Sequence, residues 1–133
     1  MLTYSILITT GYASENPKSF EYGELEIIRM SIKDKGGKPE FTTTIHFIYG
    51  ATNSISSIKT HTGYLGIEAS NEAYRDFISQ YSKKINIPDN LSEISILNVL
   101  GDDGWEIIYY SDAPAQFRNG TQPQSTYLLK RVK

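Results

Sequence analysis

The stretch that most constrains the fold is LSEISILNVLGDDGWEIIYY, residues 91–110, because it holds the signals of a helix, of its end and of a strand. Asn90 is a good helix-capping residue, and Glu93 follows it at the spacing of a capping box. At about 100° per residue, one face of the helix carries three apolar side chains, Leu91, Ile94 and Leu97. The pattern therefore predicts an amphipathic helix in the first half of this stretch.

The second half predicts the end of that helix and a strand after it. Gly101 comes directly after Leu100 and can take the left-handed conformation that ends many helices. The turn at 102–104 then leads into Trp105–Tyr110, an aromatic and β-branched run that is typical of a buried strand. We therefore expect the side chain of Trp105 to be buried against the helices.

This pattern resembles a small bacterial and phage domain that mostly carries no assigned function. That family reads strand, helix, L-x-x-L-G-x-x-G-W-E, strand, hairpin and a last strand that ends in K-R. Here LNVLGDDGWEII is followed near the C-terminus by TYLLKR. The match covers Tyr4–Ile8 loosely and Leu91–Arg131 well, with an insert at roughly 11–70 that the minimal domain lacks. The resemblance implies a fold and is almost silent on activity.

Length and composition favour a single globular domain over residues 1–133. A hydrophobic content of 39% is ordinary for a folded domain, and the absence of cysteine excludes disulfides and cysteine-based metal sites. The N-terminus lacks the charged region of a signal peptide, and no apolar run approaches the ~20 residues of a membrane span. We therefore expect a cytoplasmic protein with no membrane partner.

The charge balance argues against nucleic acid as a partner. Thirteen basic and fifteen acidic residues give a formal net charge of −2, whereas broad nucleic-acid binding needs a basic surface. A small anionic ligand is still compatible, because a few arginines in one pocket can hold it. Lys130-Arg131 is expected to face water or to pair with a carboxylate of the neighbouring strand. The ten tyrosines are unusual; tyrosine is common in half-buried sheets and is also favoured at interfaces.

Alternating apolar residues predict several strands. Their patterns cover Leu2–Thr9, Leu25–Lys33, Phe41–Tyr49 and Thr126–Val132, in addition to Trp105–Tyr110. The link KDKGGKPE places Gly36-Gly37 where the second and third of these runs reverse as a hairpin. Ile27-Ile28 breaks the alternation, so we expect either burial on both faces or a bulge there.

The rest of the chain divides into a loop region and another helix. Residues 50–66 are rich in Ser, Thr, Asn and Gly, and we expect a loop there with one short strand at most. The following helix is expected to be capped by Ser70 or Asn71, with an apolar face of Tyr74, Phe77, Ile78, Tyr81 and Ile85. The expected fold is α+β, an antiparallel sheet of about five strands with two helices packed on one face. Its free sheet edges favour a homodimer or larger homo-oligomer.

The motifs of common catalytic sites do not occur, and we expect no enzyme activity, no metal and no cofactor. Paired-histidine phosphoesterases need a hydroxyl two residues after each histidine, but Ile48 and Gly63 stand there after His46 and His61. We expect His46 on a sheet face and His61 in a loop. No P-loop, dinucleotide-binding glycine motif, H-E-x-x-H or calcium loop is present. Asp102-Asp103 are expected to be solvated turn residues.

Four residues are the candidates for a ligand-binding site: Arg29, Asn98, Phe117 and Arg118. Asn98 lies between Leu91 and Ile94 on the helical wheel, so it either bonds to nearby backbone or faces a cavity that a polar ligand fills. Phe117-Arg118 is either the tip of a hairpin or a place to stack a base and grip a phosphate. Arg29, within an apolar strand pattern, either extends to water at an edge or lines a pocket.

Some general features of the chain also resemble those of Thoeris anti-defence 1, a family of phage proteins. The similarity lies in chain length, the early strand hairpin, the helix before GWE and the late arginine-bearing loop. Members of that family sequester cyclic ADP-ribose signals of a bacterial immune system without cleaving them, as oligomers with shared pockets. The resemblance implies a sponge for a small nucleotide signal in the cytoplasm of a bacterial host cell. The alternative is a non-enzymatic interaction module whose tyrosine-rich surface binds another protein.

Overall fold

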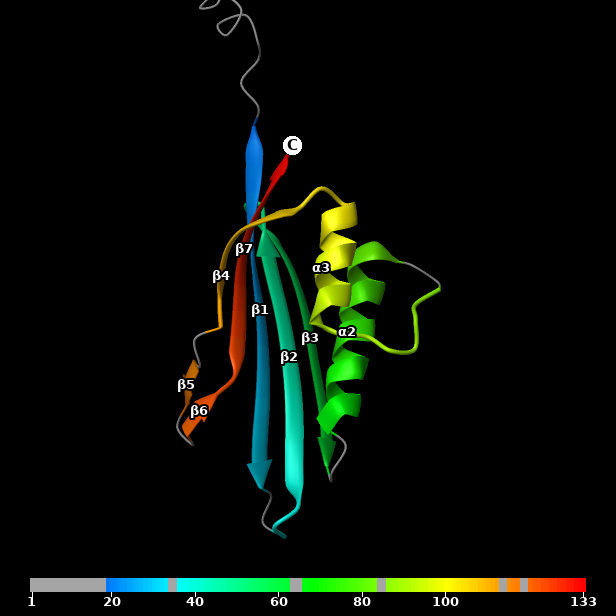
Figure 1. Cartoon of the computed structure of the whole chain (residues 1–133), viewed down its shortest axis with the longest axis vertical. Helices are drawn as coiled ribbons and strands as arrows, with labels where there is room; N and C mark the ends of the chain where they lie inside the picture. Colours follow the sequence, from blue (N-terminus) through cyan, green and yellow to red (C-terminus); the bar gives the residue numbers. More distant parts are fainter. Residues whose placement is uncertain (1–18, 34–35, 63–65, 84–85, 113–114, 118–119) are drawn as a thin grey trace, which may run out of the picture.

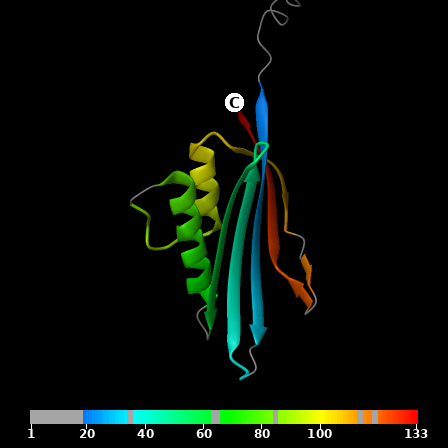
Figure 2. The same cartoon turned by 180° about the vertical axis from the view of Figure 1, so that it is seen from behind.

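A five-stranded antiparallel sheet forms the body of the fold, and two helices lie on one of its faces (Figures 1 and 2). The computed structural model describes residues 19–33, 36–62, 66–83, 86–112, 115–117 and 120–133. The strands lie in the order β3 (Asn53–Thr62), β2 (Pro39–Tyr49), β1 (Phe20–Lys33), β7 (Gln124–Val132) and β4 (Glu106–Ser111). A separate small hairpin joins β5 (Ala115–Phe117) to β6 (Gly120–Gln122), and the helices are α2 (Gly66–Ser82) and α3 (Glu93–Asp102). The predicted α+β class is confirmed.

The hairpin of β1 and β2 follows the prediction from Gly36-Gly37. The two strands pair without a register shift, and Gly37 has a positive φ of 80° in the turn. The pairing is continuous through Ile27 and Ile28, so the broken alternation is not a bulge. Ile27 is fully buried under the helices and Ile28 is partly buried on the other face. The run of two isoleucines therefore reflects the central position of β1 in the sheet.

β3 is a strand of the sheet that the sequence pattern did not predict. β3 is ten residues long, in the region where we expected a loop with one short strand at most. Ser57 is buried on the helix-covered face, whereas Ile58 is 63% exposed on the other face. Because the polar residue points inward and the apolar one outward, the apolar alternation of a half-buried strand is absent. The strand expected at Leu2–Thr9 lies outside the described residues.

α2 begins earlier than predicted, so Ser70 and Asn71 lie inside the helix and do not cap it. Both side chains are held by other elements. The hydroxyls of Ser70 and Thr43 are 2.8 Å apart, and Asn71 accepts a 2.9 Å hydrogen bond from the backbone N–H of Leu91. Of the predicted apolar face, the described members are Tyr74, Phe77 and Ile78, which are buried, and Tyr81, which is partly buried; Ile85 lies outside the described residues.

The cap of α3 is formed by different residues from those predicted. Ser92 is the N-cap and forms a capping box with Ser95, in the roles expected of Asn90 and Glu93. Glu93 is instead the first residue of the helix, where its negative charge is favourable to the helix dipole.

The buried face of α3 is also rotated from the predicted one. Ile96 and Leu100 are buried, whereas Ile94 is 66% exposed and Leu91 precedes the helix. Asn98 is exposed, so the prediction that it sits in the middle of the apolar face is wrong. At about 100° per residue it points away from the buried pair.

α3 ends at Asp102 with Asp103 as its C-cap, so the glycine that follows the helix end is Gly104 rather than Gly101. Gly104 has a positive φ of 90°, and its N–H donates to the carbonyl of Gly101 at 3.0 Å. The N–H of Trp105 donates to the carbonyl of Leu100 at 3.1 Å. These two bonds are those of a Schellman motif, and they deliver Trp105 directly from the helix end into the core.

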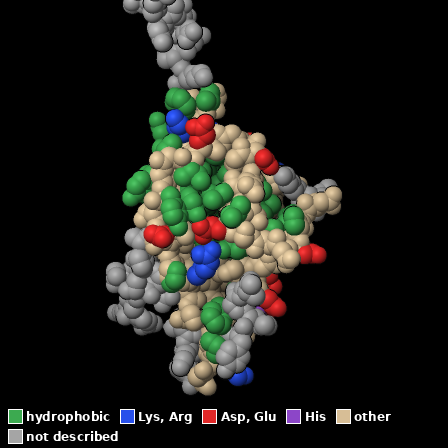
Figure 3. All heavy atoms as spheres, viewed as in Figure 1, with side chains coloured by type: hydrophobic (Ala, Val, Ile, Leu, Met, Phe, Trp, Pro, Cys, Tyr) green, Lys and Arg blue, Asp and Glu red, His purple; other side chains and the backbone are tan. Residues whose placement is uncertain are grey.

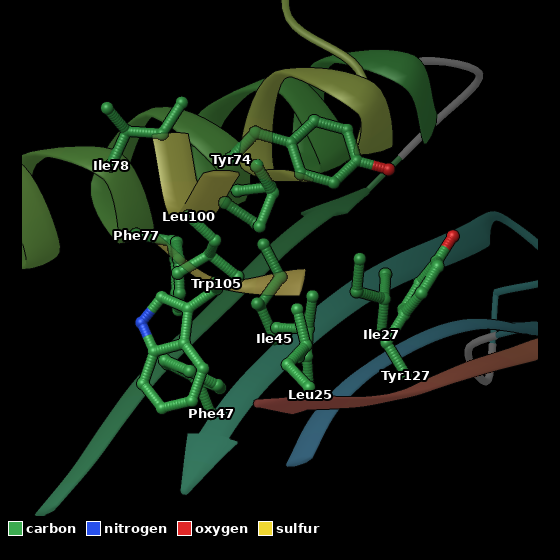
Figure 4. Close-up of a cluster of buried hydrophobic side chains, with 13 residues drawn as sticks. Leu25, Ile27, Ile45, Phe47, Tyr74, Phe77, Ile78, Leu100, Trp105 and Tyr127 are labelled. Carbon is green, nitrogen blue, oxygen red and sulfur yellow. The ribbon is translucent and has the colours of Figure 1, made fainter. Parts of the chain in front are cut away.

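Trp105 lies in an aromatic cluster at one end of the core, beside Phe47 (Figure 4). It is 4% exposed, which confirms the predicted burial. Its ring centroid is 5.4 Å from that of Phe47 and 6.0 Å from that of Tyr49, both edge to face. Its indole N–H donates to the hydroxyl of Tyr81 at 2.8 Å. The tryptophan therefore joins β2 and α2 to the end of α3.

Gly23 of β1 makes room for this cluster. A Cβ atom at this position would lie 2.7 Å from Cε1 of Phe47 and 3.3 Å from Cζ3 of Trp105. The first distance is well below van der Waals contact, and the obstacle is a buried ring. The close approach of β1 to the two rings therefore requires glycine.

β4 is not the buried strand that its apolar run predicts. In the described part of the sheet it pairs only with β7 and forms an edge. Its four large apolar side chains are 47–58% exposed, and they are Ile107, Ile108, Tyr109 and Tyr110. A continuous apolar run marks a strand that is buried on both faces, but it does not reveal which neighbours cover it.

We expect Trp105→Ala to lower the free energy of unfolding by ~3–5 kcal/mol, because it removes a large buried ring and leaves a cavity. Since Trp105 is the only tryptophan, urea denaturation should be followed by circular dichroism rather than fluorescence. A loss below ~1 kcal/mol would contradict the central position of this ring.

Alanine at two glycines should have opposite effects on stability. We expect Gly23→Ala to destabilise the protein by ~1–3 kcal/mol through overpacking. Gly101→Ala, within α3 and with nothing within 4 Å of the added Cβ, should stabilise it by ~0.5–1 kcal/mol. Urea denaturation of the two variants measures both, and equal effects would show that the space at Gly23 is not needed.

Candidate functional site

Arg29 is the predicted site residue that the structure places in a polar hollow. It lies on the helix-covered face of β1, two residues after the buried Ile27. Its Nη2 donates to Oε1 of Glu93 at 3.1 Å and to the hydroxyl of Tyr74. The side chain is 37% exposed and that of Glu93 is 21% exposed. The guanidinium is therefore partly withdrawn from water, between α2 and the first turn of α3.

Glu93 links this arginine to the sheet. Its second oxygen, Oε2, accepts a hydrogen bond from the hydroxyl of Tyr127 on β7. Figure 4 shows the hydroxyls of Tyr74 and Tyr127 at the same end of the core, away from Trp105. The carboxylate of Glu93 thus accepts hydrogen bonds from side chains of two strands, β1 and β7. Arg29 also donates to Tyr74, which connects this group to α2.

The pKa values of Tyr127 and Arg29 are both shifted in the direction that keeps these side chains protonated. Burial raises the pKa of Tyr127, and the hydrogen bond and charge of Glu93 raise it further, so the phenol stays protonated. Burial alone would lower the pKa of Arg29, but the hydrogen bonds and charges of Tyr74 and Glu93 outweigh it, and the pKa is raised. Tyr127 therefore remains a hydrogen-bond donor to Glu93, and Arg29 remains a cation.

The hollow beside Arg29 has a volume of about 460 Å³. It is lined by Arg29, Ser70, Tyr74, Leu91, Ser92, Glu93 and Ile94. The polar groups are a guanidinium, three hydroxyls and a carboxylate, and the ring of Tyr74 and the aliphatic side chains add apolar surface. The arginine carbon Cζ lies 5.9 Å from the ring centre of Tyr74, so the two side chains form one wall. This set can bind a small polar molecule that has an anionic group.

The other predicted site residues do not join Arg29 there. Asn98 lines a second hollow of about 330 Å³, on the far side of Leu91, together with Ile78, Asn86, Ile87, Pro88, Ser95, Val99 and Asp102. Phe117 ends β5, but its side chain and all of Arg118 lie outside the described residues. The structure therefore places two of the four candidates, and it puts them in different hollows.

The residues that the sequence pattern did not single out are the partners of Arg29. Tyr74 was predicted only as a core residue, and Glu93 only as part of a capping box. A tyrosine and a glutamate at helix positions carry no local signal that they meet the same strand arginine. Their meeting depends on how the two helices lie on the sheet, which the sequence pattern does not specify.

A second polar network lies at the other end of the core, beside Trp105. Arg131 donates to Glu21 of β1 and to Oδ2 of Asp103 at 2.6 Å, so of the two alternatives expected for Lys130-Arg131, Arg131 takes the pairing with a carboxylate of the neighbouring strand. The guanidinium carbon of Arg131 lies 4.6 Å from the ring centre of Trp105. Tyr81 donates to Asp103 as well. Burial and this hydrogen bond raise the pKa of Tyr81 to about 12.

The histidines and carboxylates form no cluster that suggests a metal in the described part of the chain. His46 lies on the sheet face without helices, as predicted, and hydrogen-bonds Ser56. His61 lies in β3 rather than in a loop, 3.0 Å from a carboxylate oxygen of Glu72. Among the described residues, no group of three or more metal-ligating side chains occurs. None of the described helices is long and apolar enough to cross a membrane.

Comparison with known proteins adds no assignment: no family model, curated protein or solved structure matches this chain.

The raised pKa of Tyr81 predicts a loss of stability at high pH. Because the pKa in the folded protein, about 12, exceeds the ordinary value of 10.0, the stabilisation is complete below pH 10 and is lost as the pH rises through 12. The melting temperature should therefore fall over this window, and it should fall less in Tyr81→Phe, which has no phenol to ionise. Equal falls in both proteins would show that the Tyr81 hydrogen bonds do not contribute.

Proposed function

We propose that this chain is a non-enzymatic binding protein that holds a small phosphorylated nucleotide signal beside Arg29 and sequesters it without cleavage. The observation that carries the proposal is the position of Arg29, a half-buried guanidinium in a hollow with an aromatic wall. A cyclic ADP-ribose isomer, as bound by phage anti-defence sponges, has the phosphates and the purine that such a site would receive. The candidates Phe117 and Arg118 belong to the same proposal.

The chemistry of the hollow supports this ligand class. A guanidinium offers a planar fork of donors to phosphate oxygens, and such charge-assisted bonds contribute ~1.5–3 kcal/mol each. Tyr74 and the aliphatic Leu91 and Ile94 offer surface to a base, and the hydroxyls of Ser70 and Ser92 can bond to a ribose. The volume, about 460 Å³, lies in the range of small-molecule sites.

A phosphate that binds here must compete with Glu93 for the guanidinium. Glu93 contributes one negative charge at 3.1 Å from Nη2 of Arg29, and a phosphate brought close to it would also be repelled. Neutralising this carboxylate therefore removes both a competitor and a like charge. Binding at this site should thus be weakened by changes at Arg29 and strengthened by a neutral residue at position 93.

We expect Glu93→Gln to tighten, and Arg29→Lys to weaken, the binding of cyclic ADP-ribose isomers or cyclic dinucleotides. Lysine keeps the charge of Arg29 but lacks the fork that fits a phosphate. Isothermal titration calorimetry measures the affinities, and a thermal shift screens the panel, since a ligand at about 100 times its dissociation constant adds ~2.7 kcal/mol to stability.

Arg75→Lys is the matched control. Arg75 donates to the backbone carbonyl of Pro88 at 2.9 Å and does not line the hollow of Arg29, so binding should be unchanged. No shift with any ligand, or equal affinities of Arg29→Lys and the parent, would remove the site from this hollow.

A protein interaction module is the second candidate function. It is favoured by β4, where Tyr109 is 58% exposed and Tyr110 48% exposed. Aromatic side chains of this kind are enriched in protein interfaces.

A further inference from the structure

The edge strand β4 exposes an apolar surface that is unusual for a strand of a monomer. Its four large apolar side chains, Ile107, Ile108, Tyr109 and Tyr110, are each 47–58% exposed. Edge strands of soluble proteins are commonly protected by lysine, proline or short length, and EIIYYS contains neither lysine nor proline.

The opposite edge of the sheet is protected in the usual way. β3 reads NSISSIKTHT, and it carries Lys59, serines and threonines with isolated isoleucines. The longer helix, α2, packs on β3 and β2, which lie at the far side of the sheet from β4. The two edges of the described sheet therefore differ, and of the two it is β4 that combines a free strand edge with a continuous apolar run.

Both faces of β4 contribute to this surface. Ile107 and Tyr110 lie opposite Leu129 and Tyr127 of β7, two core residues, so they point to the helix side. Tyr109 lies opposite Leu128 on the other side. Figure 3 shows hydrophobic side chains gathered between β4 and α3, and α3 contributes an exposed large apolar side chain, Ile94. A patch of this kind marks a protein interaction site.

We infer that β4 is the interface between two copies of this chain, which pair their β4 strands antiparallel across a two-fold axis. The strand is complementary to itself in this direction. With the axis between Ile108 and Tyr109, Ile107 opposes Tyr110 and Ile108 opposes Tyr109. β-branched and aromatic residues form favourable cross-strand pairs.

The charges and the faces fit the same register. Glu106 opposes Ser111 of the other copy, so no like charges meet. Ile107 and Tyr110, which oppose each other, both lie on the helix side, as residues paired across strands must. The register shift between Ile107 and Tyr109 is a bulge of the kind that can discourage edge pairing, but here it carries an exposed isoleucine instead of a charge. A two-fold contact also closes after two copies, whereas pairing of β4 with β3 would propagate.

The test is the association state of the full chain, measured by sedimentation velocity over a concentration series. We expect a dimer for the parent. Ile108→Lys should weaken dimerisation by about 100-fold or more, because the two-fold axis brings both lysines into one interface. Ile58→Lys is the matched control, since Ile58 is an exposed isoleucine on the other edge strand, and it should dimerise like the parent. Circular dichroism melts of both variants establish that they are folded.

Cysteine cross-linking tests the direction of pairing, because the chain has no cysteine of its own. Glu106→Cys mixed with Ser111→Cys should form a disulfide-linked dimer under mild oxidation, since these positions oppose each other in the antiparallel register. Glu106→Cys alone should not, because its own counterpart lies at the other end of the interface. Cross-linking of Glu106→Cys alone would overturn the antiparallel register.

Three further results would overturn the inference. A parent that stays monomeric would exclude a second copy, and in that case hydrogen exchange at β4, compared with and without residues 1–18, would show whether the chain covers its own edge. Dimerisation of Ile108→Lys as strong as that of the parent would place the interface elsewhere. Loss of the dimer in Ile58→Lys alone would place it at β3.

Discussion

The contact of Trp105 with Phe47, made possible by Gly23, is the interaction on which the rest of the fold depends. The Schellman turn at Gly104 carries Trp105 from the end of α3 straight into this contact. Burial of such a ring is worth ~3–5 kcal/mol, a large share of the ~5–15 kcal/mol by which a domain is stable. The helix end, the central hairpin and the start of β4 are therefore positioned by one side chain.

The two polar networks at the ends of the core contribute more to the orientation of side chains than to the free energy of unfolding. Arg131 and Arg29 each pair with a carboxylate, and the side chains in these pairs are 16–53% exposed. Exposed ion pairs contribute only ~0–1 kcal/mol, far less than the buried rings between them. Their value lies in orientation, because each holds a guanidinium against an aromatic ring and ties strand to helix. At Arg29 this leaves a positive charge in a hollow, on which the proposed ligand site rests.

Tyr127 connects the hollow of Arg29 to the edge strand β4. The rings of Tyr110 and Tyr127 are 4.8 Å apart, and the hydroxyl of Tyr127 donates to Glu93, the partner of Arg29. A second copy paired at β4 would contact Tyr110, which is connected to the guanidinium through Tyr127 and Glu93. Ligand binding and self-association would then be coupled to the extent that either one moves Tyr127.

The features that the sequence determined by itself were local: the order of most elements, the glycine turn of the hairpin, the burial of Trp105 and the α+β class. These depend on periodicity and turn chemistry, which act over a few residues. The tertiary structure alone decided which face of α3 is buried, and this face leaves Asn98 exposed. It also decided that β3 joins the sheet, although its sequence lacks the alternating apolar residues of a half-buried strand. It also decided the exposure of β4 and the meeting of Arg29 with Tyr74 and Glu93. Each of these depends on which distant element is the neighbour, and the apolar or polar character of a residue does not encode its neighbour.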